Sequence, residues 1–133
     1  MNEKLMFSKK TDDWSTPQDL FNALNEEFNF TMDPCPLRSL TDGLDLDWNG
    51  NIFINPPYSN VYSFLEKGIN ELRNGHAQTL VYLLASRTDT KWFHHFIYNK
   101  PNVEIRFIKG RLKFGNQKNS APFPSMIVII KNQ

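Results

Sequence analysis

The most informative stretch of the sequence is residues 51–58, which read Asn-Ile-Phe-Ile-Asn-Pro-Pro-Tyr. The apolar residues at 52–54 predict a short buried strand. The two prolines must end it, because proline has no N–H to donate to a sheet ladder. In an open α/β sheet, ligands bind beyond the carboxyl ends of the strands. The stretch therefore predicts a functional loop at residues 55–58, directly after a strand.

The segments on either side of this loop predict alternating helices and strands. Helices are expected where apolar residues recur at helical spacing, over residues 17–29, 60–74 and from Asp89 onward. Apolar runs predict the other strands, at residues 30–33, 79–85, 103–108 and 125–130. Residues 109–114 are expected to form a tight turn and a hairpin arm. This order predicts an α/β fold with a mixed sheet.

The composition is that of an ordinary globular protein, with 133 residues, 40% hydrophobic and 22% charged. We expect residues 1–13, which lack periodicity, to be a flexible arm, and residues 14–133 to be a single domain. The apolar runs are far shorter than the ~20 residues that cross a bilayer, and no signal peptide is evident. A cytoplasmic protein that does not bind membranes is expected.

The charge is unevenly distributed along the chain. Residues 1–60 hold four basic and ten acidic residues, a net charge of −6, whereas residues 61–133 hold eleven and four, a net charge of +7. Such asymmetry is typical of a protein with one surface that faces a polyanion. Four basic residues are expected to contact nucleic acid, because they follow a strand or lie in the predicted hairpin: Arg87, Lys109, Arg111 and Lys113.

The loop after the strand has the chemistry to hold a planar amine. The Asn55 amide oxygen and the Pro56 carbonyl are two neighbouring acceptors, and Pro57 keeps the backbone rigid. An adenine amine is a poor nucleophile because its lone pair is delocalised into the ring. Two acceptors that attract its hydrogens favour the pyramidal, nucleophilic form, and Tyr58 offers a ring on which a flipped base can stack. A rigid turn with a surface tyrosine is the simpler alternative.

Several blocks of sequence resemble the small phage-type DNA N6-adenine methyltransferases, the phage Dam-like family. They lie at residues 14–17, 30–33, 55–58, 83–93, 110–115 and 121–125. The resemblance implies a compact Rossmann-like fold, S-adenosylmethionine as the methyl donor and a flipped adenine in double-stranded DNA as the substrate. It implies a catalytic role for Asn55, Pro56, Pro57 and Tyr58. The residues implied to bind the cofactor are Trp14, Thr16, Pro17, Asp33, Pro34 and Cys35.

The sequence leaves some alternatives open. The same loop suits an RNA base or a protein glutamine amide, and an inactive nucleic-acid-binding module could keep the fold. The usual glycine-rich cofactor loop is missing, since Pro34, Cys35 and Pro36 follow Asp33. A homo-oligomer is possible, and a phage or prophage gene would place the protein in the host cytoplasm. No metal is expected, because the half calcium loop at 45–50 has Pro56 where the bidentate carboxylate belongs.

The start of the first helix also carries a prediction. Thr16 is expected to cap it, with Pro17 in the first turn and Asp19 in a capping-box position.

Overall fold

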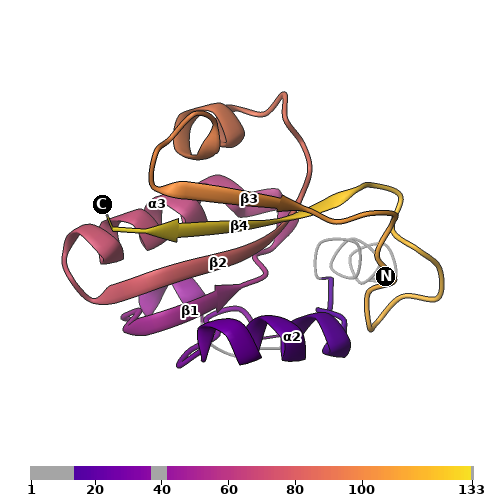
Figure 1. Cartoon of the computed structure of the whole chain (residues 1–133), viewed down its shortest axis with the longest axis horizontal. Helices are drawn as coiled ribbons and strands as arrows, with labels where there is room; N and C mark the ends of the chain where they lie inside the picture. Colours follow the sequence, from indigo (N-terminus) through magenta and orange to yellow (C-terminus); the bar gives the residue numbers. More distant parts are fainter. Residues whose placement is uncertain (1–13, 37–41, 133) are drawn as a thin grey trace, which may run out of the picture.

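The computed structural model describes residues 14–36 and 42–132. In this part of the chain one mixed sheet has the strand order β1-β2-β4-β3. The strands are β1 (Gly50–Ile54), β2 (Ala77–Ala85), β3 (Val103–Phe107) and β4 (Ser125–Lys131). β1 and β2 are parallel, and β4 is antiparallel to both β2 and β3. Strands β1, β2 and β3 therefore all end on the right in Figure 1, at what we call the carboxyl end of the sheet.

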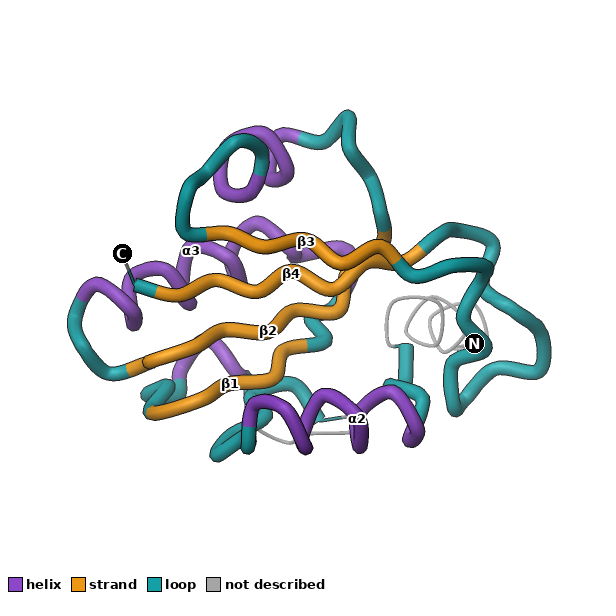
Figure 2. Tube along the Cα trace, viewed as in Figure 1, coloured by secondary structure: helices purple, strands orange, loops and turns teal. Residues whose placement is uncertain are grey.

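Both faces of the sheet are covered. Successive side chains of a strand point to opposite faces, so one strand contributes to the core on each side. Ile52 and Ile54 pack with helix α3 (Val61–Arg73) in one core cluster, while Phe53 packs in a second cluster with helix α2 (Gln18–Phe28). Figures 1 and 2 show α2 in front of the sheet and α3 behind it. Helix α3 connects β1 to β2, as a parallel pair of strands requires.

Most of the predicted elements are confirmed. The helices predicted over 17–29 and 60–74 are α2 and α3, and α2 ends where Asn29 adopts a left-handed conformation with φ 53°. The strands predicted at 51–54, 79–85, 103–108 and 125–130 correspond to β1 to β4. The α/β class with a mixed sheet is thus correct. The predicted arm, residues 1–13, lies outside the described residues.

The predicted strand at 30–33 is reduced to a single bridge. Met32 pairs with Ile52 in parallel, beside β1, and the Phe53 N–H donates to the Met32 carbonyl at 3.0 Å. Pro34 then prevents further pairing, because it has no N–H. Residue 33 therefore lies beside the end of β1, at the carboxyl end of the sheet.

The hairpin predicted at 109–114 is wrong. Residues 108–124 form a long loop at the carboxyl end of the sheet, seen in orange and yellow on the right of Figure 1. The backbone of this loop bonds elsewhere, since the Gly115 N–H donates to the Ser15 carbonyl at 2.9 Å and the Ala121 N–H donates to the Leu112 carbonyl at 2.7 Å. Among the described strands, β3 is therefore an edge strand that pairs with β4 alone.

The helix predicted from Asp89 begins two residues later than expected, at Lys91, and continues as a π-helix over Phe93–Ile97. Residues 87–90 form a turn instead, because the Thr90 hydroxyl donates to the Arg87 carbonyl at 2.7 Å. Phe93 and Ile97 are buried in the same core cluster as α3, so this short helix covers the same face of the sheet.

Candidate functional site

The predicted loop lies at the carboxyl end of the sheet. Asn55 follows the last residue of β1, and after the two prolines a 3₁₀ turn, Tyr58–Asn60, leads directly into α3. The neighbouring strand β2 ends nearby with Ala85, because the two strands run in parallel. The loop is therefore held on one side by the sheet and on the other by the start of a helix.

The Asn55 side chain has a defined orientation. Its Nδ2 donates to the Trp14 carbonyl and to the Thr16 hydroxyl, the second bond at 3.0 Å. A backbone carbonyl can only accept, so the atom that faces it must be the amide nitrogen. The amide oxygen Oδ1 consequently points the other way. It is buried and has no hydrogen-bond partner in the described part of the chain.

Three further side-chain atoms share this condition among the described residues. The Tyr58, Ser86 and Ser125 hydroxyl oxygens are buried without a hydrogen-bond partner. Ser86 directly follows the end of β2, and Ser125 pairs with the last residue of that strand, so all four atoms lie at the carboxyl end of the sheet. An unpaired buried polar group costs about 1–3 kcal/mol. Their collection at one place is typical of a binding site.

Sequence reasoning did not select Ser86 and Ser125 as site residues. The signal that could have found them is position, since each is a small polar residue at the point where an apolar strand begins or ends at the carboxyl end of the sheet.

An aromatic cluster surrounds Tyr58. Its ring is 6.3 Å from the Trp14 ring, at an angle of 28°, and 5.4 Å from the Phe123 ring. Trp14 also contacts Phe114, at 5.3 Å. Burial raises the pKa of the Tyr58 hydroxyl, and the charge of Arg87 partly opposes this rise. Tyr58 is therefore neutral, and its apolar surroundings suit the flat face of a base.

The predicted nucleic-acid contacts lie beside this cluster or on a loop that contributes to it. The Arg87 guanidinium carbon is 5.9 Å from the centre of the Phe123 ring, so this residue lies at the candidate site as expected. Lys109, Arg111 and Lys113 are exposed on the loop 108–124, which carries the cluster residues Phe114 and Phe123. The basic residues thus lie near the aromatic cluster, although on a loop rather than on the predicted hairpin.

The predicted cofactor residues separate into two groups. Asp33, Pro34 and Cys35 follow the bridge beside β1, and the Asp33 carboxylate accepts from the Cys35 N–H at 3.0 Å. Burial raises the pKa of Asp33, and this hydrogen bond partly offsets the rise. Gly43 packs behind this turn, where a Cβ atom would overlap the Pro34 carbonyl oxygen.

Trp14 and Thr16 belong to the other group, because they bond to Asn55. The expected capping role of Thr16 is wrong. Helix α2 begins after Pro17 without a side-chain cap, since the Thr16 hydroxyl accepts from Asn55 instead. Pro17 itself accepts the first helical bond, from the Phe21 N–H at 3.0 Å.

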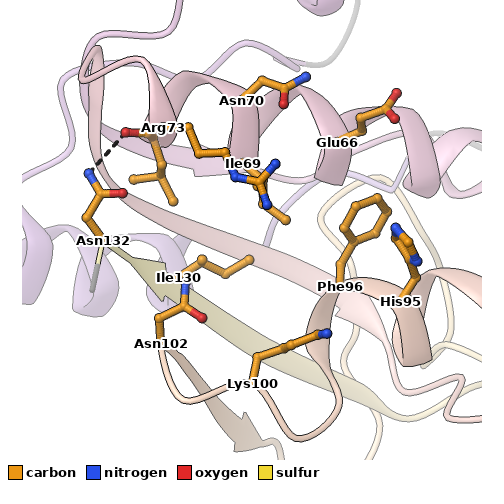
Figure 3. A pocket seen from close by; sticks show the side chains of 11 residues that line it. Glu66, Ile69, Asn70, Arg73, His95, Phe96, Lys100, Asn102, Ile130 and Asn132 are labelled. Carbon is orange, nitrogen blue, oxygen red and sulfur yellow. Dashed lines mark hydrogen bonds between the residues drawn. The ribbon is translucent and has the colours of Figure 1, made fainter.

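A separate hollow of about 570 Å³ lies at the opposite end of the sheet, between α3 and the π-helix (Figure 3). Its walls include Arg73 and Lys100, and Asn132 at its rim donates to the Leu72 carbonyl at 3.0 Å. None of the predicted site residues lines it. We therefore place the candidate site at the carboxyl end of the sheet.

Two features are absent from the described residues. No group of three or more His, Cys, Asp and Glu side chains there could hold a metal ion. No helix in the same residues is both long enough and apolar enough to cross a membrane.

Comparison with known proteins gives consistent results. A family model described as DNA N-6-adenine-methyltransferase (Dam) matches residues 4–133. The chain is 28% identical over 144 residues to a protein of Haemophilus phage HP1 (strain HP1c1) named DNA N-6-adenine-methyltransferase, an alignment that covers 93% of this chain and 82% of the phage protein. No solved structure matches the chain significantly.

Proposed function

Because the chain belongs to the DNA N-6-adenine-methyltransferase (Dam) family, we propose that Asn55 and the Pro56 carbonyl hold the exocyclic amine of the target adenine. The protein is a DNA adenine methyltransferase that uses S-adenosylmethionine as the methyl donor, so the activity and cofactor implied by the sequence resemblance are confirmed. The family favours DNA over the alternatives of an RNA base or a glutamine amide, and an active enzyme over an inactive module.

One observation carries the assignment of Asn55. Its Oδ1 is a buried acceptor without a partner in the described part of the chain, and its Nδ2 is already bonded to Trp14 and Thr16. The amide is thus oriented before the substrate arrives, which is the condition for an interaction that is strong in the transition state. Because Oδ1 is buried, the base can reach it only when the side chains that cover it move.

The two acceptors act on the electrons of the amine. The Asn55 oxygen and the Pro56 carbonyl each attract one hydrogen of the NH₂ group, which favours a pyramidal nitrogen whose lone pair is free to attack. S-adenosylmethionine supplies the methyl group on a positively charged sulfur. When the cofactor is bound, these residues would hold the amine beside it and keep water away from the reacting nitrogen.

Tyr58 supports the base through its ring rather than its hydroxyl. The ring lies in the aromatic cluster with Trp14 and Phe123, while the hydroxyl is buried without a partner among the described residues. A flipped adenine gains stacking energy there that offsets part of the cost of leaving the duplex.

The residues around Asp33 fit the charge of the cofactor. The Asp33 carboxyl is desolvated enough to raise its pKa, so a cationic partner would be favourable beside it. Asp33 lies beside the carboxyl end of β1, and the Asn55 loop continues from the same end of that strand. We propose that Asp33, Pro34 and Cys35 hold the cofactor next to Asn55, together with Trp14 and Pro17 at the start of α2.

The proposal also includes the predicted fold type and the predicted DNA contacts. The parallel β1-α3-β2 unit, with its site at the carboxyl end of the sheet, supports a Rossmann-like fold. The exposed loop residues Lys109, Arg111 and Lys113 suit the phosphates of double-stranded DNA. The single domain over 14–133, a homo-oligomer and a cytoplasmic location stay predictions.

Replacement of Asn55 tests the proposal. Asn55→Ala is expected to lower the turnover number about a hundredfold to a thousandfold, by analogy with the loss of one preorganised partner in other enzymes. The affinity for S-adenosylmethionine should hardly change, because the lost contact is to the amine. The assay is tritiated methyl transfer to duplex DNA, with N6-methyladenine identified by mass spectrometry. Asn70→Ala, on an exposed position of α3, is the matched control.

Further variants at the site refine the test. Asn55→Asp should retain more activity than Asn55→Ala, since a carboxylate still offers an acceptor. Tyr58→Phe should be mild, because it removes a hydroxyl that is buried without a partner in the described chain. Tyr58→Ala should weaken base capture by about 1–3 kcal/mol. Wild-type turnover by Asn55→Ala would refute the proposed mechanism.

A further inference from the structure

The Asn55 amide is held by a segment far away in the sequence. Its two partners, the Trp14 carbonyl and the Thr16 hydroxyl, lie 41 and 39 residues earlier. Without these bonds, rotation of the amide about its last torsion angle would exchange Oδ1 and Nδ2, because the two atoms are similar in size and differ only in hydrogen bonding. A donor would then face the amine in place of an acceptor.

The segment is itself fixed by contacts with the loop 108–124. The Gly115 N–H donates to the Ser15 carbonyl at 2.9 Å, and the Ser15 N–H donates to the Asn116 side-chain oxygen at 2.9 Å. The Trp14 ring adds an edge contact with Phe123, at 5.1 Å. The segment 14–16, which precedes α2, is therefore held in place by the loop 108–124, and the Thr16 hydroxyl is not used as a helix cap.

We propose that Thr16 is a positioning residue: the Trp14 carbonyl, which can only accept, selects Nδ2, and the Thr16 hydroxyl holds Nδ2 there, so that Oδ1 faces the target amine. This inference rests on the proposed role of Asn55. It differs from the sequence-based interpretation, in which Thr16 binds the cofactor. The Thr16 hydroxyl acts on the reaction through Asn55, and the Thr16 methyl group only fills space.

The first test separates positioning from cofactor binding. Thr16→Val keeps the shape of the side chain but removes the acceptor, so kcat should fall about tenfold, the effect expected for one hydrogen bond. The KM for S-adenosylmethionine should stay within a factor of two. Thr16→Ser keeps the hydroxyl and should recover most of the activity. Thr79→Val, in β2 at the opposite end of the sheet, is the matched control.

The second test asks whether the effect passes through Asn55. In an Asn55→Ala background the amide is gone, so Thr16→Val should lower the single-turnover rate no further. A residue that only stabilises the fold or binds the cofactor would still cause its full loss in that background. Thermal unfolding of each variant shows whether the chain remains folded.

The possible results distinguish the role of Thr16 from the role of Asn55. A raised KM for S-adenosylmethionine with unchanged kcat in Thr16→Val would overturn the positioning role and make Thr16 a cofactor ligand. Additive losses in the double variant would also overturn it, while the role of Asn55 would stand. If Asn55→Ala were fully active, the proposed role of Asn55 itself would fail, whatever Thr16 did.

Discussion

Gly68 offers a quantitative test of how α3 is seated on the sheet. A Cβ atom at this position would overlap the Tyr82 hydroxyl oxygen and would lie 2.8 Å from Leu80 Cδ1. The Tyr82 hydroxyl cannot easily move aside, because it is fully buried and donates to the Phe64 carbonyl at 2.7 Å. Gly68→Ala must therefore displace the Tyr82 hydroxyl from its partner and also crowd the packing of α3 against β2.

The expected cost follows from three contributions. Overpacking costs about 1–3 kcal/mol, and a buried hydroxyl without its partner costs about 1–3 kcal/mol. The better helix propensity of alanine returns about 1 kcal/mol. We expect the free energy of unfolding to fall by about 3 kcal/mol, the middle of the range that these contributions span. Turnover should fall too, since α3 continues directly from the turn that carries Tyr58.

Urea unfolding followed by tryptophan fluorescence measures this change, with Trp48 as a buried probe beside Phe64. Tyr82→Phe provides the internal control, because it removes the oxygen that the new methyl group would meet. In that background Gly68→Ala should cost about 1 kcal/mol or less. A Gly68→Ala protein that is more stable than the wild type would refute the reasoning.

Two predictions concern the binding of the cofactor and DNA. Burial raises the pKa of Asp33 on folding, so the charged carboxylate destabilises the folded chain at any pH above the pKa that Asp33 has in the unfolded chain. Asp33→Asn should therefore increase the free energy of unfolding at pH 7 and yet weaken the binding of S-adenosylmethionine. Scanning calorimetry measures the first effect, and titration calorimetry measures the second. An unchanged cofactor affinity would contradict the role of this carboxylate. Replacing Lys109, Arg111 and Lys113 together by alanine should reduce the slope of log affinity for duplex DNA against log salt by roughly 0.9 per contact. The control replaces Arg73, Lys100 and Lys131, which carry the same charge at the opposite end of the sheet, and an equal loss of slope in both variants would refute a specific DNA surface on the loop 108–124.

Strands and helices with strong local patterns could be predicted from the sequence. The continuous apolar run of β2 and the helical spacing of α3 each have one favourable structure, because burial on both faces or on one face imposes that pattern. The hairpin at 109–114 could not be rejected in this way. Its outcome depends on a hydrogen bond from Gly115 to Ser15, a hundred residues earlier, for which the local sequence carries no signal.

The sequence by itself determined the chemistry at residues 55–58, because the acceptors and the ring are properties of the residues, and the prolines restrict the backbone of any chain that contains them. It also determined that this loop follows a strand. Only the tertiary structure decided which atom of the Asn55 amide is available, since the Trp14 carbonyl and the Thr16 hydroxyl reach it from the start of α2. The same folding changed the role of Thr16 from a helix cap to a partner of Asn55, and it brought the buried Ser86 and Ser125 hydroxyls to the site. These outcomes depend on contacts between residues distant in the chain, which local propensity does not encode.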